Sequence, residues 1–307
     1  MICFSLRWIG PNQTQRHSLV LKNLVDSLTL EKRSFVRWPI LFLILLGLGV
    51  MLRREWRLQP DGHLHVHFLD VGQGDSALIV SPSGKQIVID GGPDLTTLEE
   101  AGKKMPFFDR SIDLLVLTHP NTDHLVSLPS LLHRYRIAQI LVTGVPFELG
   151  RYEELIAAIE EEHPTVIFAD PAKDLDFGDG LVLDIVWPPT DTPEREWEDV
   201  NDASIVLRAL YKDQSILFTG DIEETAEREI LASGADVSAT VLKVAHHGSK
   251  TSSSTGFLLE VHPSLAVISV AQENSYGHPS PSILDRFAHF KIPVKMTSTE
   301  GTISLTF

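Results

Sequence analysis

The chain has 307 residues, 43% of them hydrophobic, which suits one large folded domain or two small ones. It has one cysteine, Cys3, which excludes both a disulfide framework and a zinc site built from thiolates. Its net charge of −15 is uneven, because residues 1–58 carry nine basic and three acidic side chains, net +6, which leaves −21 on residues 59–307. The acidic charge of residues 59–307, the body of the protein, argues against a broad nucleic-acid-binding face, since phosphate binding depends on Lys and Arg.

The first predicted element is an uncharged apolar run at residues 38–52, WPILFLILLGLGVML. As a helix it spans roughly 22 Å, short of the about 30 Å of a bilayer core, but two preceding apolar residues extend it and Arg37 can reach the headgroups. We predict a single transmembrane helix at 35–53 after a basic tail at 1–34, with a buried core helix as the alternative. Six basic residues precede the run and three follow it, which places the tail in the cytoplasm and the body outside the cell membrane. A start at Met51 would instead give a soluble protein.

From residue 63 onward, short β-branched segments, several with period-two alternation, predict strands, and helical patterns lie between some of them. The predicted strands are 63–70, 77–82, 85–90, 114–119, 139–144, 166–170, 181–187, 204–210, 215–220, 241–247, 265–270 and 302–307. The predicted helices are 123–135, 152–162, 222–233 and 280–290. The polar segment 188–202 is predicted to be a surface loop. This order predicts an α/β body with two sheets and outer helices.

Acidic and histidine side chains gather in four motifs, each after a predicted strand. The motifs are LTHPNTDH (117–124) with His119, Asp123 and His124, FTGD (218–221) with Asp221, KVAHHGS (243–249) with His246 and His247, and SYGHP (275–279) with His278. Taken singly, each histidine is more often structural than a ligand, and the two aspartates also suit helix caps. Together the four strand-end motifs favour a binuclear metal site in which Asp221 bridges two ions.

In this order the motifs resemble the metallo-β-lactamase superfamily. The segment HFLDVGQGDSALIVSPSGKQIVIDGG (67–92), with HHGSKTSSS (246–254), more specifically resembles the metallo-β-lactamase domain of the ComEC family of DNA-uptake competence proteins. The resemblance covers residues 63–307 and implies a four-layer αββα hydrolase domain with metal between the sheet edges. It implies metal ligands at His119, Asp123, His124, Asp221, His278 and one of His246 and His247, of which His247 matches the histidine of the superfamily pattern. Asp75, within DVGQGD, is expected to orient a ligand or shape the loop.

Two positions depart from the superfamily pattern. Asn121 stands where the loop should carry a second histidine, and Asn201 or Asp202 stands where a further histidine is expected. The first metal position therefore offers amide oxygens, which favour hard ions such as Mn²⁺ or Mg²⁺ over Zn²⁺. Because Asp123 and Asp221 are retained, we predict a modified but working site for two divalent ions, Mn²⁺ or Zn²⁺, with one position weaker.

The resemblance implies hydrolysis by metal-activated water, with Asp123 at the catalytic centre and His246 as the proton donor to the leaving group. It favours a membrane-tethered phosphodiesterase or nuclease that acts on DNA. The alternatives are a phosphodiesterase for small molecules or lipid headgroups, and a non-catalytic component of a membrane complex. With one predicted span, the chain is not expected to import DNA by itself. DNA capture by the acidic body requires basic side chains to gather beside the site, for which the candidates are Lys243, Lys250, Arg286 and Lys291.

Overall fold

The computed structural model describes residues 13–147 and 150–307, with residues 13–17 and 27–37 described by their backbone alone. The chain divides into two compact units at residues 57–58. The predicted hydrolase domain at 63–307 falls within the second unit, and the predicted tail and anchor fall within the first.

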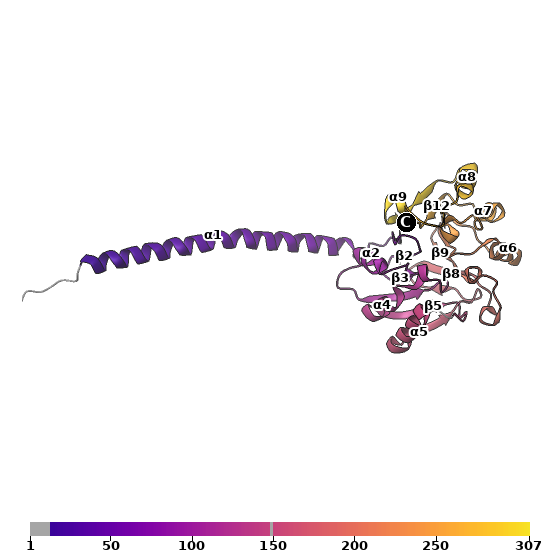
Figure 1. Cartoon of the computed structure of the whole chain (residues 1–307), viewed down its shortest axis with the longest axis horizontal. Helices are drawn as coiled ribbons and strands as arrows, with labels where there is room; N and C mark the ends of the chain where they lie inside the picture. The colour runs from indigo at the N-terminus through magenta and orange to yellow at the C-terminus, as the bar shows by residue number, and fades with distance from the viewer. Residues whose placement is uncertain (1–12, 148–149) are drawn as a thin grey trace, which may run out of the picture. The chain divides into compact units, whose positions relative to one another are not determined.

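The first unit contains one long helix, α1 (Gln13–Arg57) (Figure 1). Residues 1–12 of the predicted tail lie outside the described residues. In the described part of the chain, no helix is both long enough and apolar enough to cross a membrane. The predicted transmembrane helix at 35–53 is therefore not supported by the structure, because its uncharged run, 38–52, is shorter than the about 20 residues that a span requires.

The second unit is built on two mixed seven-stranded sheets, A and B. Sheet A has the order β14-β1-β2-β3-β4-β5-β6, with β1 (His65–Phe68), β2 (Ala77–Val80), β3 (Gln86–Ile89), β4 (Ser111–Val116), β5 (Arg136–Val142), β6 (Thr165–Phe168) and β14 (Ile303–Thr306). Sheet B has the order β13-β12-β11-β10-β9-β8-β7, with β7 (Leu175–Asp176), β8 (Leu181–Trp187), β9 (Val206–Tyr211), β10 (Gln214–Phe218), β11 (Val241–Lys243), β12 (Leu265–Ile268) and β13 (Val294–Met296). In each sheet one half is parallel, β3 to β6 in sheet A and β10 to β13 in sheet B.

Strand alternation builds a helix–sheet–sheet–helix order of layers. On β3, Ile87 and Ile89 join the core between the sheets, whereas Val88 points to the outer core of sheet A. The outer core of sheet A is covered by α2 (Thr96–Lys104), α4 (Leu128–Arg134) and α5 (Gly150–Glu162), and that of sheet B by α6 (Glu224–Ser233), α7 (Thr255–Val261) and α8 (Pro281–His289) (Figure 1). The predicted α/β body with two sheets and outer helices is therefore confirmed.

Some element boundaries differ from the prediction. The predicted helix 123–135 is two helices, α3 (Thr122–Leu125) and α4, and Pro129 lies in the first turn of α4. The sequence analysis missed β7, β13 and three helices, α2, α7 and α9 (Thr297–Glu300). The two strands are short and lack a clear alternation, so local pattern gives them no signal. The predicted loop 188–202 contains two short 3₁₀ turns, η1 (Thr192–Glu194) and η2 (Val200–Ala203).

Candidate metal centre

The candidate site forms where strands of both sheets end. Asp90 follows β3 and His119 lies just beyond β4, while Asp221 lies just beyond β10 and His247 follows β11 in the 3₁₀ turn η3 (Ala245–Gly248). Parallel neighbours such as β3 and β4, or β10 and β11, end on the same edge of their sheet. This topology brings motifs that are far apart in the sequence to one place.

Four of the predicted residues form one group: Asp123, His124, Asp221 and His247. One ligand atom of each lies within 4.8 Å of the others. The Asp221 Oδ2 atom is 3.3 Å from His124 Nε2 and 3.4 Å from His247 Nε2, and Asp123 Oδ2 is 3.2 Å from His247 Nε2. Three of the four side chains are buried, but that of Asp123 is 35% exposed, so the group is accessible from the side of Asp123.

The ring of His124 is held by Asp90, which the sequence analysis did not identify. Asp90 Oδ2 accepts a hydrogen bond from His124 Nδ1 at 2.8 Å. The same carboxylate accepts bonds from the backbone N–H and the hydroxyl of Thr118, at 2.8 and 2.7 Å. A carboxylate behind a histidine fixes the ring so that the other nitrogen faces the metal position. The available signal was the end of the predicted strand 85–90, the same strand-end position that identified the other motifs.

His247 is held from behind in a similar way. Its Nδ1 atom donates to the Ser269 carbonyl oxygen at 3.0 Å and lies 3.3 Å from Asp75 Oδ1. Its backbone has φ 53°, and this left-handed turn directs the ring inward immediately before Gly248. Asp75 therefore lies directly behind a member of the group, at the position expected for a residue that orients a ligand.

The electrostatics of the group show an excess of negative charge. Burial would lower the pKa of His124, but Asp221 and Asp90 outweigh it and raise this pKa well above its usual value. Burial would also lower the pKa of His247, but the charges of Asp221 and Asp75 outweigh burial and raise this pKa to about 10. The carboxylates thus draw positive charge onto two buried histidines, and a divalent cation would satisfy the same field.

Several buried polar atoms at the centre have no hydrogen-bond partner among the described residues. They are His119 Nε2, His124 Nε2, Asp221 Oδ1, Asp75 Oδ1 and His278 Nδ1. Among the described residues His124 Nε2 has none, although Asp221 Oδ2 is 3.3 Å away. Buried polar groups are rarely left without partners, and imidazole nitrogens and carboxylate oxygens are ligands of divalent ions. The residues therefore fit a bound metal ion.

His119 lies beside the group, and the two departures from the superfamily pattern contact each other. The ring of His119 is fully buried with its centroid 4.1 Å from that of His124, and burial followed by the charge of His124 lowers its pKa to about 3. Asn121 Nδ2 donates to Asn201 Oδ1 at 2.7 Å. The two residues that replace expected histidines are thus in direct contact, and the sequence alone did not predict this contact.

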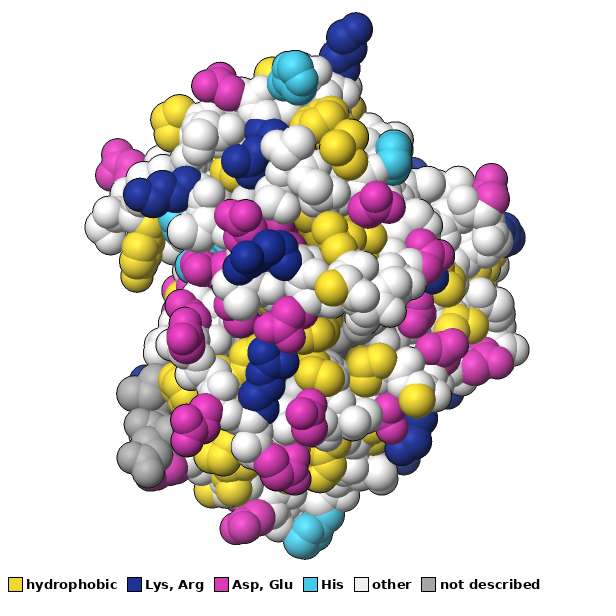
Figure 2. All heavy atoms as spheres, turned by 90° about the vertical axis from the view of Figure 1, so that its right-hand side faces the viewer, with side chains coloured by type: hydrophobic (Ala, Val, Ile, Leu, Met, Phe, Trp, Pro, Cys, Tyr) yellow, Lys and Arg dark blue, Asp and Glu magenta, His cyan; other side chains and the backbone are white. Residues whose placement is uncertain are grey.

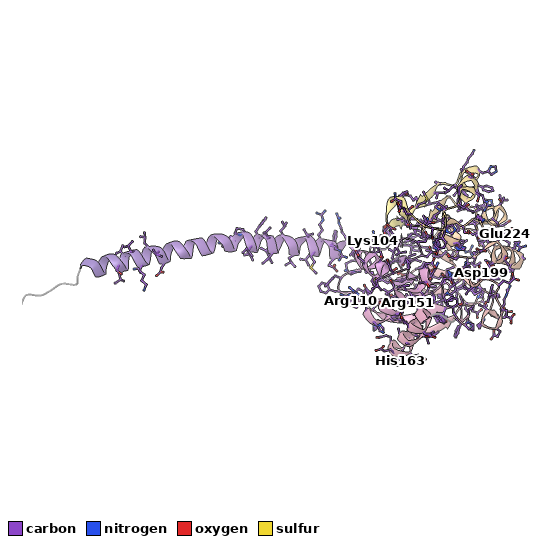
Figure 3. All side chains as sticks on the ribbon, viewed as in Figure 1. Lys104, Arg110, Arg151, His163, Asp199 and Glu224 are labelled. Carbon is purple, nitrogen blue, oxygen red and sulfur yellow. The ribbon has the colours of Figure 1, made fainter. Side chains whose placement is uncertain are left out.

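Asp202, predicted as a possible ligand, has another role in the structure. Its Oδ1 atom accepts hydrogen bonds from the backbone N–H groups of Glu223 and Ala226, at 2.8 and 3.4 Å, at the start of α6. The segment that carries Asp199 lies near the start of this helix at Glu224 (Figure 3). Asp202 thus caps a helix, because its carboxylate is already committed to backbone donors, and Asn201 is the residue that faces Asn121.

His246 and His278 lie beside the group rather than in it. His246 Nδ1 is 3.1 Å from Glu223 Oε1, and Glu223 also accepts a hydrogen bond from the Thr251 hydroxyl at 2.7 Å. The ring centroid of His278 is 5.6 Å from that of His246 and 6.5 Å from that of His247. Of the adjacent pair, His247 is therefore the one that belongs to the four-residue group, and His246 is oriented by a carboxylate that the sequence analysis did not identify.

The basic residues that were considered for DNA capture do not all lie free beside the site. Lys243 is buried and paired with Asp75, and Arg286 donates to the carbonyl oxygens of Ser252 and Ser253. On the face shown in Figure 2, Lys and Arg side chains form separate groups among acidic ones rather than one continuous basic surface.

Comparison with known proteins agrees with this fold. Residues 69–271 match the metallo-β-lactamase superfamily. The chain is 28% identical to the ComE operon protein 3 of Bacillus subtilis (strain 168), over 79% of this chain and 33% of that protein. It is also 28% identical to Recombination protein 2 of Haemophilus influenzae, over 96% of this chain and 35% of that protein. Identity to the Competence protein ComA of Neisseria gonorrhoeae is 28% as well, over 93% of this chain and 38% of that protein. The chain thus spans about a third of the length of these relatives.

Solved structures show the same fold at low identity. The metallo-β-lactamase fold protein YhfI from Bacillus subtilis superposes with a TM-score of 0.54 at 10% identity, over 80% of this chain and all of that one. The metallo hydrolase Igni18 from Ignicoccus hospitalis superposes with a TM-score of 0.53 at 15% identity, over 79% of this chain and 99% of that one. The resemblance to ComEC-like competence proteins is confirmed by the curated relatives. With residues 69–271 matched, the chain belongs to the metallo-β-lactamase superfamily.

Proposed function

We propose that this protein is a metal-dependent phosphodiesterase that cleaves DNA. The observation that carries the proposal is the group Asp123, His124, Asp221 and His247, whose ligand atoms converge with no competing hydrogen bonds at His124 Nε2 and Asp221 Oδ1. Two of the relatives are named Recombination protein 2 and Competence protein ComA, which supports DNA as the substrate class. Because the chain spans about a third of the length of those relatives, the activity of the whole relatives is not assigned to this chain.

Two ion positions are proposed. The four-residue group would hold one ion, and His119, Asp221, Asn121 and Asn201 would hold the other through one nitrogen and several oxygens. The second set is rich in oxygen donors, which favours Mn²⁺ or Mg²⁺ there. When bound, such ions lower the pKa of water and stabilise the charge that develops on a phosphoryl group.

The protein's own residues supply orientation and a proton. Asp90 and Asp75 hold the rings of His124 and His247, so these side chains do not have to reorganise during the reaction. The partly exposed Asp123 leaves one side of the group accessible to a substrate phosphate. His246, held at Nδ1 by Glu223, presents its other nitrogen to donate a proton to the leaving oxygen.

The proposal is tested with the full chain, stripped of metal and supplied with Mn²⁺, Mg²⁺ or Zn²⁺ and single-stranded DNA. We expect cleavage that is strongest with Mn²⁺ and that falls by at least about 100-fold in Asp123→Ala and in Asp221→Ala. Asp176→Ala, an exposed carboxylate on β7, serves as the control and should cleave like the unchanged chain. Cleavage that is unaffected by Asp221→Ala would contradict the proposal.

A second candidate is hydrolysis of small phosphodiesters, including lipid headgroups. It is favoured by the net charge of −21 on residues 59–307 and by the scattered basic side chains in Figure 2, which give a long polyanion little to bind. Hydrolysis of bis(p-nitrophenyl) phosphate without any cleavage of DNA would favour this candidate. Failure to bind any of the three ions would instead favour a non-catalytic component of a membrane complex.

Attachment to the cell membrane, with the catalytic unit outside the cytoplasm, remains a prediction from the sequence. What supports it is the exposed apolar surface of α1, where Trp38 is 71% and Phe42 is 65% exposed. Fractionation of cells that express the chain, followed by protease treatment of intact spheroplasts, tests it. Recovery of the chain in the soluble fraction would contradict it.

A further inference from the structure

A lysine is buried directly behind the candidate metal centre. Lys243 is the last residue of β11 and only 4% exposed. Its ammonium group forms an ion pair with Asp75 Oδ2 and lies 3.5 Å from the carbonyl oxygen of Gly220, the residue before Asp221. A lysine is almost never fully buried unless it is paired, so this position needs a specific explanation.

The pair continues into the metal group through one histidine. The other oxygen of Asp75, Oδ1, lies 3.3 Å from His247 Nδ1, while His247 Nε2 faces Asp123 and Asp221. Lys243, Asp75 and His247 thus form a chain of contacts that ends at the ligand atoms. Asp75 is itself fixed, because its backbone N–H donates to the Asp123 carbonyl at 3.2 Å.

The charge of the centre explains why a cation belongs there. Four carboxylates surround the histidines: Asp75, Asp90, Asp123 and Asp221. In the described part of the chain, Lys243 is the one lysine or arginine in ion-pair contact with any of them. Buried carboxylates repel one another strongly without compensation, and the divalent ions that would compensate them are absent until metal is bound.

We propose that Lys243 and Asp75 form a permanent ion pair that positions His247 and keeps the acidic centre folded before metal is bound. The proposal rests on the metal-binding role inferred above. The chemistry that each partner supplies is distinct: Asp75 orients the ring, and Lys243 offsets the charge of the residue that does so. Lys243 is therefore a positioning residue and not a group for binding DNA.

The ion pair predicts a specific response to Lys243→Met. Without the ammonium group, Asp75 adds one more uncompensated charge to the metal-free centre, and we expect the Tm of the metal-free protein to fall by about 10 °C. A bound divalent ion lies on the other side of His247 and offsets part of this charge. The rise in Tm on adding Mn²⁺ should therefore be larger in the variant than in the unchanged chain.

The experiment compares four full-length proteins by thermal unfolding, first in EDTA and then with saturating Mn²⁺. They are the unchanged chain, Lys243→Met, the double variant Asp75→Asn with Lys243→Met, and Arg208→Met. The double variant removes both charges and keeps a side chain of nearly the same shape beside His247, so it should recover at least half of the lost Tm. Arg208→Met is the matched control, because Arg208 on β9 pairs with Asp184 on β8 and with Asp236 in the loop before β11, and none of these residues belongs to the centre. It should lower Tm equally with and without Mn²⁺.

Each outcome decides the proposal. A larger Mn²⁺-induced rise in Lys243→Met, with recovery in the double variant, supports it. Equal losses with and without Mn²⁺, as in Arg208→Met, would show a merely structural role and overturn it. If Lys243→Met does not fold, the double variant still decides, since a folded double variant supports the proposal and an unfolded one overturns it. No Mn²⁺-induced rise in the unchanged chain would overturn the metal site itself, independently of Lys243.

Discussion

At the scale of single residues, the centre departs from the superfamily in a coordinated way. Asn121 and Asn201 come from opposite sheets' loops, 80 positions apart, and their side chains bond to each other at 2.7 Å. Replacement of one expected histidine alone would leave an imidazole opposite an amide, whereas two amides satisfy one another. Both departures from the pattern therefore meet in one contact, whereas Asp123 and Asp221 keep the carboxylates that the pattern expects.

Restoring both histidines should change the metal preference. In the double variant Asn121→His with Asn201→His, we expect the affinity for Zn²⁺ to rise by at least about tenfold relative to Mn²⁺, since imidazole is the softer ligand. Asn121→His alone should show a smaller change, because Asn201 then lacks its amide partner. Competition with a chromophoric chelator measures both affinities. An unchanged Zn²⁺ to Mn²⁺ ratio in the double variant would show that these residues do not face an ion.

Asp90 should control metal affinity without touching the ion. In Asp90→Asn, one carboxylate oxygen becomes an NH₂ group, which cannot accept from His124 Nδ1, and the ring loses its orientation. The left-handed backbone at this position, φ 62°, is one that asparagine adopts readily. We expect metal affinity to fall by about 10- to 100-fold. Asp113→Asn, a partly exposed carboxylate paired with Lys85, is the control, and equal losses in both variants would argue against the assigned role.

At the scale of elements, the structure separates caps from ligands, which share the same residue types. Asp202 lies in the 3₁₀ turn η2 and Asp221 lies just before α6, and both are buried. Only the three-dimensional arrangement shows that Asp202 accepts from the N–H groups of α6, whereas Asp221 Oδ1 has no partner. The distinction follows from which donors each carboxylate meets, and a local pattern does not contain that information.

Substitution of Asp202 should separate its role as a helix cap from its predicted role as a metal ligand. Asp202→Ala should lower the free energy of unfolding by about 1 kcal/mol, within the range for lost caps, and leave metal affinity unchanged. Asp202→Asn keeps a side-chain oxygen for the cap and should be close to the unchanged chain. Urea unfolding and chelator competition on the same samples check both points. A drop in metal affinity in Asp202→Ala would return Asp202 to the list of ligands.

The pairing of β1 with β14 should contribute a dependence on pH. His67 on β1 is buried, its Nδ1 lies 2.8 Å from the Ser304 hydroxyl on β14, and burial, then Lys104, lower its pKa to about 3. The folded pKa lies below the unfolded value of about 6.5, so the unfolded chain binds the proton more tightly. Stability from this group is therefore complete above about pH 6.5 and is lost as pH falls toward 3.

This dependence can be isolated by substitution. His67→Gln should reduce the slope of unfolding free energy against pH between about 6.5 and 3 by up to ~1.4 kcal/mol per pH unit, the contribution of one proton. His65→Gln, the more exposed histidine two residues earlier, is the control. Urea unfolding of metal-free protein across this range measures the slopes. Identical slopes in His67→Gln and the unchanged chain would show that His67 is protonated in the folded state.

At the scale of the whole molecule, the catalytic unit carries its own cores. Among the side chains that the structure describes, the three clusters of buried apolar residues all lie between Leu64 and Ile303, and none includes a residue of α1. Folding of the second unit should therefore not depend on the first. A fragment of residues 58–307 should unfold cooperatively, with a Tm and a Mn²⁺-induced rise like those of the full chain. Calorimetry tests this, and a fragment that aggregates or melts without cooperativity would contradict it.

The sequence by itself determined the fold class, the order of twelve strands and the family, because strand alternation and strand-end motifs are local signals. It also predicted Asp123, His124 and Asp221 as ligands, since parallel strands bring their ends together whatever the intervening lengths, but it left the choice between His246 and His247 open. Membrane attachment is a proposal that rests on the apolar run and on the exposed apolar side chains of α1.

Only the tertiary structure decided which oxygen and nitrogen atoms are free to bind a metal. The Asn121–Asn201 bond, the support of His124 by Asp90, the pairing of Lys243 with Asp75 and the capping role of Asp202 all join residues that are 21 or more positions apart. Their side chains are of ordinary types, and nothing in their local sequence distinguishes a cap from a ligand or a surface lysine from a buried one. The reason is physical: a polar side chain takes its role from the donors, acceptors and charges that the folded chain places around it.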